Sequence, residues 1–447
     1  MKKLFLILIV LFIISGCGNN SDSTTTDTND VEEYPNAKVI NLDTDKATID
    51  NQEIKEYDYT LTIDPDSTEE IYSGQEPEGN IYIAHDIIYY PEVDEDSFEL
   101  VNYDGEREWA THYTAEEATD YYFGLLPSQG SELPTQMMHS KLEAYSNPVL
   151  HINEAGEYIL QGNFNGQIAI DLGEDSFTDE DCKVTIILNG ANVTCSVAPA
   201  FIVYNAYEVD NAWEEAETHS NEVDLTNAGV KIILVDGTEN NFIGANVYRL
   251  LKAEYKKDST EVQKKRYKYD AAFYSCVSML IDSESKGTGI LNVTSTTFEG
   301  LDTELHLTIN NGYINIYSQD DGINVNEDDV SVFTMNGGHL TIFAGQGAEG
   351  DVIDSNGYIK VNGGILAGTS PSSMDDILDS NNGAEVSDDA KIYSGGNAKT
   401  DINSGPMTPP GGFGGGQPPE GFNFEEMGQP PEGFGERPEM PQGNMPN

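Results

Sequence analysis

The chain has 447 residues and carries 78 Asp and Glu against 22 Lys and Arg, which gives a formal net charge of −56 at pH 7. A surface this acidic repels the phosphates of nucleic acids and of anionic lipid headgroups, so it argues against both as partners. The same charge favours the binding of cations.

The N-terminus has the pattern of a bacterial lipoprotein signal. Two lysines precede an apolar run over residues 4–14, which suits a secretion signal and is too short for a spanning helix. The next residues, Ile14-Ser15-Gly16-Cys17, resemble the lipoprotein processing site, whose Cys is lipidated after cleavage. We expect residues 1–17 to be the signal peptide and lipobox. A lipid on Cys17 would anchor the mature chain to the outer face of a bacterial cell membrane.

The next segments are expected to be a tether and a folded region. Residues 18–30 are rich in Ser, Thr, Asp and Asn and nearly free of apolar residues, which predicts a disordered tether. Residues 31–136 are acidic and aromatic, with strand-like runs over 57–63 and 81–90. We interpret this region as a β-rich module or as the cap that a solenoid needs at its open end. Its tyrosines would either stack on sugars or, more simply, pack between strands.

Residues 137–396 contain a repeat that predicts a solenoid of strands. The phrases Asn310-Asn311-Gly312, Asn336-Gly337-Gly338 and Asn362-Gly363-Gly364 begin 26 residues apart, and alternating apolar residues precede and follow each phrase. A unit of this length cannot bury its own apolar residues, whereas stacked units cover one another. We therefore predict an all-β fold, a right-handed parallel β-helix. Equivalent residues of successive coils would lie about 4.8 Å apart.

Acidic residues return with this repeat and predict bound calcium. Each of four coils shows an acid, an apolar residue two positions later, and an Asp or Asn three positions later. Stacked like charges would repel by roughly 3 to 4 kcal/mol for each adjacent pair at an effective dielectric constant near 20. Shared Ca²⁺ would offset this repulsion, because it takes oxygen ligands at about 2.3–2.6 Å. The alternative is that Asp and Asn before Gly only make turns. The candidate ligands are Glu299, Asp302, Asp320, Asp321, Asn324, Asp351, Asp354, Asp375, Asp376 and Asp379.

Three further side chains are candidates for contact with carbohydrate. Tyr317 and Phe343 lie one repeat apart, so they should stack on one flank as a flat strip that suits a sugar ring. The alternative is that this pair only stabilises the stacked strands. Lys360 should point outward from a strand, where a solvated lysine is the simpler interpretation and contact with a glycan, or a role as catalytic base, is the alternative.

Other features are less informative. Eight of the 22 basic residues lie in residues 248–268, a helix-like insertion that would either clamp an anionic sugar chain or pair with the acidic surface. Once Cys17 is lipidated, three cysteines remain, which permits one intramolecular disulfide at most. The Cys and His spacing does not predict zinc. Residues 397–447 are rich in Gly, Pro and Met and are expected to form a disordered tail.

Residues 137–396 resemble the β-helical, calcium-binding carbohydrate-binding proteins of bacterial cell surfaces, which are structural relatives of the pectate lyases. The phrases that carry the resemblance are MHSKLEAYSNP at 138–148, GQIAIDLGED at 166–175 and GDVIDSNG at 350–357. The resemblance implies a β-helical fold, a polysaccharide partner and Asp-rich turns that bind calcium. Those turns correspond here to Asp321, Asn324, Asp351, Asp354, Asp376 and Asp379. Asn324 departs from the family pattern, in which an Asp is expected, so weaker metal binding is implied at its coil.

The sequence thus predicts an extracellular, lipid-anchored, calcium-dependent protein that binds polysaccharide without catalysis. The polymer would be an acidic plant or cell-wall glycan such as pectin, or cellulose, and Ca²⁺ would bridge protein and sugar carboxylates. One alternative is a calcium-dependent, pectate-type polysaccharide lyase, which needs a basic side chain beside the metal. Another is a structural surface adhesin whose ions only hold the coils together. We expect a monomer that meets the membrane only through the lipid on Cys17 and that does not bind nucleic acid.

Overall fold

The structure is a computed structural model that describes residues 34–63, 70–89, 99–101, 110–112, 139–210, 221–247, 269–346, 350–373 and 375–396. The predicted signal peptide and tether, the basic insertion over 248–268 and the tail over 397–447 lie outside the described residues. Of the unit Met1–Pro35 only Tyr34 and Pro35 are described, and the fold below is that of the second unit, Asn36–Asn447.

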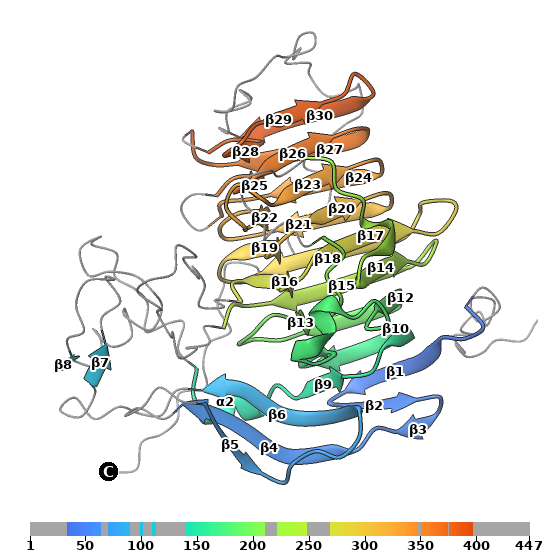
Figure 1. Cartoon of the computed structure of the whole chain (residues 1–447), viewed down its shortest axis with the longest axis vertical. Helices are drawn as coiled ribbons and strands as arrows, with labels where there is room; N and C mark the ends of the chain where they lie inside the picture. Colours follow the sequence, from blue (N-terminus) through green and yellow to red (C-terminus); the bar gives the residue numbers. More distant parts are fainter. Residues whose placement is uncertain are drawn as a thin grey trace, which may run out of the picture. The chain divides into compact units, whose positions relative to one another are not determined.

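Most described strands stack into three parallel ladders, to which each full coil contributes one strand in turn (Figure 1). Ladder A contains β1 (Lys38–Thr44), β10 (Gly156–Asn165), β12 (Val184–Thr194), β14 (Val230–Leu234), β17 (Met279–Ser283), β20 (Leu307–Ile309), β23 (Val332–Met335), β26 (Tyr358–Val361) and β29 (Ala384–Val386). Ladder B continues from the C-terminal half of β12 through β15 (Glu239–Gly244), β18 (Ile290–Ser295), β21 (Tyr313–Tyr317), β24 (His339–Phe343), β27 (Gly364–Ser370) and β30 (Ala390–Gly396).

Ladder C is the third face of the coils, and its strands carry five of the ten candidate metal ligands, namely Glu299, Asp302, Asn324, Asp354 and Asp379. It contains β9 (Val149–Ile152), β11 (Gln167–Asp171), β13 (Phe201–Asn205), β16 (Ala271–Ser275), β19 (Glu299–Thr303), β22 (Ile323–Val325), β25 (Ile353–Ser355) and β28 (Asp379–Ser380). The chain is thus an all-β solenoid of parallel strands, as the repeat predicts.

Alternation along each strand explains the core. In β21, Ile314 and Ile316 are buried while Tyr313 and Asn315 are exposed. Leu340 and Ile342 occupy the same buried positions one coil later in β24. Each coil therefore adds one layer to a continuous apolar interior, and neighbouring layers cover one another.

The Asn-Gly-Gly phrases are the turns between ladders A and B. The third residue of each phrase has a positive φ, 102° at Gly312, 78° at Gly338 and 85° at Gly364, a conformation that disfavours residues with a Cβ. The first residues form a ladder of amides, in which Asn336 Nδ2 donates to Asn310 Oδ1 at 2.9 Å and Asn362 Nδ2 donates to Asn336 Oδ1 at 2.8 Å. The predicted 26-residue period is confirmed by these contacts and by the strand register beside them.

The N-terminal region extends the sheets at the first coil. Strand β1 pairs in parallel with β10, and β6 (Ile81–Tyr89) pairs antiparallel with β9. The other strands of this region are β2 (Lys46–Ile49), β3 (Gln52–Glu53), β4 (Glu56–Ile63) and β5 (Glu70–Gly74), and β7 (Glu99–Val101) with β8 (Ala110–His112) forms a separate two-stranded sheet. Strands β1 and β6 therefore pair with the backbone of the first coils, as strands of a cap on an open sheet end would.

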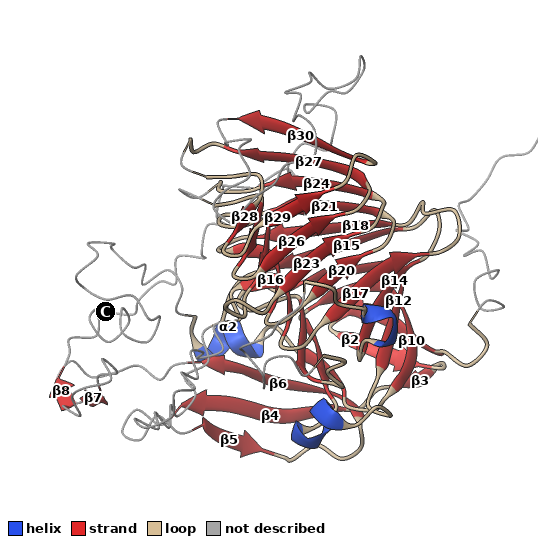
Figure 2. Ribbon diagram, turned by 45° about the horizontal axis from the view of Figure 1, so that its top comes forward, coloured by secondary structure: helices blue, strands red, loops and turns tan. Residues whose placement is uncertain are grey.

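Helix is scarce in the described residues (Figure 2). Helix α2 (Lys141–Tyr145) begins with a capping box between Ser140 and Glu143, and 3₁₀ helices span Glu174–Thr178 and Leu225–Asn227. Within the described part of the chain, no helix has both the length and the apolar character that crossing a membrane requires. Within the described residues, Cys182, Cys195 and Cys276 form no disulfide bond.

Candidate metal and carbohydrate sites

The strand register of ladder C stacks the acidic residues into two columns. Asp302 pairs with Asn324, Asn324 with Asp354, and Asp354 with Asp379, and these four residues form the first column. The second column lies three residues before the first and contains Glu299, the first residue of β19, together with Asp321, Asp351 and Asp376, which precede their strands. Its backbone bonds run from coil to coil, from Gly300 N to Asp321 O at 2.9 Å, Gly322 N to Asp351 O at 2.9 Å and Val352 N to Asp376 O at 3.0 Å. The predicted alignment of the four acidic segments is therefore present in the fold.

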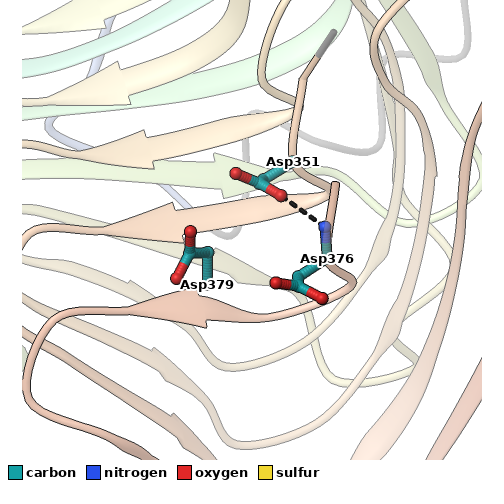
Figure 3. Close-up of side chains that lie close together, drawn as sticks. All are labelled: Asp351, Asp376 and Asp379. Atoms are coloured by element: carbon teal, nitrogen blue, oxygen red, sulfur yellow. Dashed lines mark hydrogen bonds between the residues drawn. The ribbon is translucent and has the colours of Figure 1, made fainter. Parts of the chain in front are cut away.

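Three carboxylates converge at the C-terminal end of these columns (Figure 3). Asp351, Asp376 and Asp379 each offer one oxygen, and these oxygens lie within 4.8 Å of one another. Asp351 Oδ1 also accepts a hydrogen bond from the Asp376 backbone N at 2.5 Å, which fixes the carboxylate between the two coils. Ligands on opposite sides of one Ca²⁺ lie about 5 Å apart, so this spacing fits a shared ion.

Two further column residues, Glu299 and Asn324, are also buried. Glu299 is 7% exposed and Asn324 is 9% exposed, and the buried atoms Glu299 Oε2 and Asn324 Oδ1 have no hydrogen-bond partner in the described structure. A buried oxygen without a donor costs free energy, and a bound cation would supply the missing partner. The donor set is entirely oxygen, which suits Ca²⁺ and not zinc.

The pKa values show that these carboxyl groups resist ionisation when no cation is bound. Burial raises the pKa of Glu299 well above its usual value, and the charges of Asp270 and Asp320 raise it further. Burial likewise raises the pKa of Asp351 and of Asp354 to about 7, with Asp379 the strongest neighbouring charge on each. The neighbouring charges that raise these three pKa values all belong to carboxylates, so a bound cation would favour the ionised forms at neutral pH.

Not every predicted ligand is positioned alike. Asp375 Oδ2 accepts hydrogen bonds from Gly350 N at 3.0 Å and from Ser370 Oγ at 2.5 Å, so its carboxylate holds a turn in place. Asp320 contributes charge to the pKa shifts of Asp321 and Glu299, but the group of three converging oxygens does not include it.

Asp270 was missed by sequence reasoning. It is buried, its charge raises the pKa of Glu299, and its carbonyl accepts the Glu299 N–H at 3.1 Å from the next coil. Aromatic Tyr274 pairs with Asp302 where a second acid would be expected, so this coil lacks the pattern that identified the other four. A search for single acids just before ladder C strands would have found it.

The aromatic residues of ladder B lie where the repeat predicts. Tyr317 and Phe343 are register partners on β21 and β24, with ring centroids 6.4 Å apart and planes tilted by 32°. The same two strands carry a second pair that the sequence reasoning missed, Tyr313 and His339. Their centroids are 4.5 Å apart and their planes differ by 11°. Tyr313 and His339 thus have the shorter centroid distance and the more nearly parallel rings, and they lie at the opposite end of the strands from Tyr317 and Phe343.

The expectation of a solvated Lys360 was wrong. Its side chain is 9% exposed, and Nζ donates to Glu222 Oε1 at 2.5 Å. Glu222 lies 138 residues earlier in the chain and covers the outer surface of ladder A at this point. An amine held in this ion pair is not offered to a glycan on the surface.

One comparison with known proteins, a match to a family model, points to carbohydrate. A family model described as "Carbohydrate-binding domain-containing protein" matches residues 214–409. Among solved structures, the chain is similar to a polysaccharide lyase-like protein from C. thermocellum (a gadolinium derivative). The identity is 16%, the TM-score is 0.40, and the match covers 76% of this chain and 92% of that one. No curated protein matches the chain. The coils that carry both acidic columns thus lie inside the range that matches a carbohydrate-binding family.

Proposed function

We propose that the chain is an extracellular, lipid-anchored protein that binds polysaccharide in the presence of Ca²⁺ and does not cleave it. The observation that carries the proposal is the carbohydrate-binding family match over residues 214–409, which includes both acidic columns. The signal pattern that ends at Cys17 supports the lipid anchor and the extracellular location. We further propose a right-handed coil, the hand of nearly all crossovers between parallel strands.

Calcium would act in two ways. Ions between successive coils would neutralise stacked carboxylates such as Asp351 and Asp379, whose oxygens lie within 4.8 Å of each other. An ion with incomplete protein ligation would also accept a sugar carboxylate, which lets a protein of charge −56 hold an acidic polymer.

The positions of the lysines favour binding over catalysis. A calcium-dependent lyase needs a base close to the metal and the sugar carboxylate. Lys360 lies in ladder A and is paired with Glu222, and Lys391 lies in ladder B, whereas the acidic columns belong to ladder C. Neither lysine shares a ladder with the proposed metal ligands.

A retention assay tests this function. The full chain is incubated with polygalacturonate and with cellulose, in Ca²⁺ or in chelator, while the ultraviolet absorbance of unsaturated sugar products is followed. Retention in Ca²⁺ without product is the expected result. Calcium-dependent formation of product would instead identify a lyase. If the chain showed neither retention nor product, the structural adhesin would be the remaining candidate.

A further inference from the structure

A groove of about 450 Å³ runs across the start of the ladder B strands. Its lining includes one register column, in which Tyr313, His339, Ile365 and Lys391 come from four successive coils. Lys286 lines the groove from the coil before Tyr313. Five coils at the usual strand spacing extend about 19 Å, which is enough for a short stretch of a linear polymer. We call this surface the lysine groove.

The positive charge of these coils is concentrated in the lysine groove. Residues 269–396 contain three Lys or Arg residues, namely Lys286, Lys360 and Lys391. Lys360 is buried against Glu222, whereas Lys286 and Lys391 are exposed and line the groove. Two of the three cations therefore face one site in a strongly acidic chain. One carboxylate, Asp389, also lines the groove, and Asp236 accepts the backbone N–H of Lys286 at 2.8 Å.

Between the two lysines, the groove is lined by two aromatic rings and by glycine backbone. Tyr313 is 39% exposed and stacks on the half-buried His339. Both rings combine an apolar body with a polar tip, which suits a sugar with C–H groups and hydroxyls on the same ring. Gly337, Gly338 and Gly364 also line the groove, and without side chains there a ligand can approach the backbone closely.

We propose that the lysine groove is the direct binding site for a carboxylate-bearing sugar chain, with Lys286 and Lys391 pairing with its carboxylates and Tyr313 and His339 contacting its rings. This inference rests on the proposed polysaccharide binding and names its site. It places the direct contacts between protein side chains and sugar on ladder B, separate from any calcium-bridged contact at the acidic columns of ladder C, and at the opposite end of β21 and β24 from Tyr317 and Phe343.

Charge removal tests the groove. We expect the double variant Lys286→Gln with Lys391→Gln to bind an oligogalacturonate about tenfold or more weakly at constant Ca²⁺. Each substitution removes one charged hydrogen bond between the protein and a sugar carboxylate. Lys231→Gln is the control, because Lys231 belongs to β14 in ladder A and lies outside the groove. It should change the affinity less than about twofold. Cellulose carries no carboxylates, so its retention should be equal in all these variants.

Ring removal is the second arm. Tyr313→Ala with His339→Ala should weaken oligogalacturonate binding more than Tyr317→Ala with Phe343→Ala, which removes the ring pair at the other end of the same two strands. The reverse order would place the sugar on Tyr317 and Phe343 and overturn the groove proposal. Unchanged thermal midpoints would show that the variants are folded.

The outcomes separate the two proposals. If the unaltered chain binds oligogalacturonate and the double lysine variant binds equally well, the groove proposal is overturned and the proposed function stands. If the unaltered chain retains only cellulose, the groove proposal is likewise overturned. If it retains neither polymer, both proposals fail.

Discussion

At the scale of single residues, the acidic columns hold carboxyl groups whose ionised forms are disfavoured by burial and by neighbouring carboxylates. Burial and the charge of Asp379 raise the pKa of Asp354 to about 7, so at pH 8 this carboxylate is ionised against an unfavourable field. Asp354→Asn should therefore raise the unfolding midpoint in chelator at pH 8 and, by removing a ligand, weaken Ca²⁺ binding about tenfold or more. Calorimetry with and without Ca²⁺ measures both effects. Asp388→Asn, at an exposed position outside the columns, is the control. A variant whose Ca²⁺ affinity matched the unaltered chain would exclude Asp354 as a ligand.

The same groups predict an unusual dependence of stability on pH. Asp351 and Asp354 have pKa values of about 7 in the fold, whereas an unfolded Asp titrates near 3.9. Between these values the folded chain binds more protons than the unfolded chain, so stability in chelator should fall as pH rises from about 5 to 8. Bound Ca²⁺ requires ionised ligands, so its affinity should rise over the same range, by up to about tenfold per pH unit for each carboxyl that must lose its proton. Thermal unfolding in chelator and in Ca²⁺ across this range checks both signs. A calcium-free midpoint that rises with pH would contradict the buried columns.

At the scale of elements, the sequence repeat predicted how the strands of successive coils pair. The 26-residue spacing between Leu307, Phe333 and Ile359 set the register of β20, β23 and β26 in ladder A, because the two coils that separate them have the same length. In ladder C the coil lengths vary, since Leu301 pairs with Ile323 and Ile323 pairs with Ile353. In ladder C the alignment of the coils was predicted from the pattern of acidic residues and not from the 26-residue period.

The contacts that the sequence did not predict join segments that lie far apart in the chain. The pairing of Lys360 with Glu222 joins residues 138 positions apart, and no local pattern indicates it. The lysine groove was missed for the same reason, since Lys286 and Lys391 come together only once several coils are stacked. Periodicity predicts which residues share a column, but not which loops cover a column.

The Asn-Gly-Gly turns give a test of the coil geometry. Gly338 has φ of 78°, and a Cβ there would lie 2.7 Å from Gly312 O in the preceding coil. Gly338→Ala should therefore combine left-handed strain of about 1–2 kcal/mol with a clash against backbone. Gly237 has φ of 77°, and a Cβ there would have no atom within 4 Å, so Gly237→Ala reports the strain alone. Urea unfolding should show the larger loss for Gly338→Ala, and equal losses would mean that the coils are not stacked this closely.

At the scale of the whole molecule, a solenoid need not lose its coils together, because each coil contacts only its neighbours. The acidic columns occupy the coils from Glu299 to Asp379, whereas the coils from β9 to β15 are joined to the N-terminal strands through β1 and β6. Calcium would therefore stabilise one part of the stack in particular. Binding to the folded chain alone adds about 2.7 kcal/mol when free Ca²⁺ is one hundred times the dissociation constant.

Removal of calcium should consequently loosen the C-terminal coils before the N-terminal ones. Amide hydrogen exchange in chelator at pH 8 should accelerate first in β19, β22, β25 and β28, while β10 and β12 keep their protection. Mg²⁺ should restore protection poorly, since it demands octahedral geometry and retains its waters, whereas the columns offer oxygens spaced for a larger ion. A uniform change along all coils would mean that the ions, if bound, act on the stack as one cooperative unit. No change at all would mean that the columns are stable without metal, and the calcium dependence proposed for glycan binding would lose its structural basis.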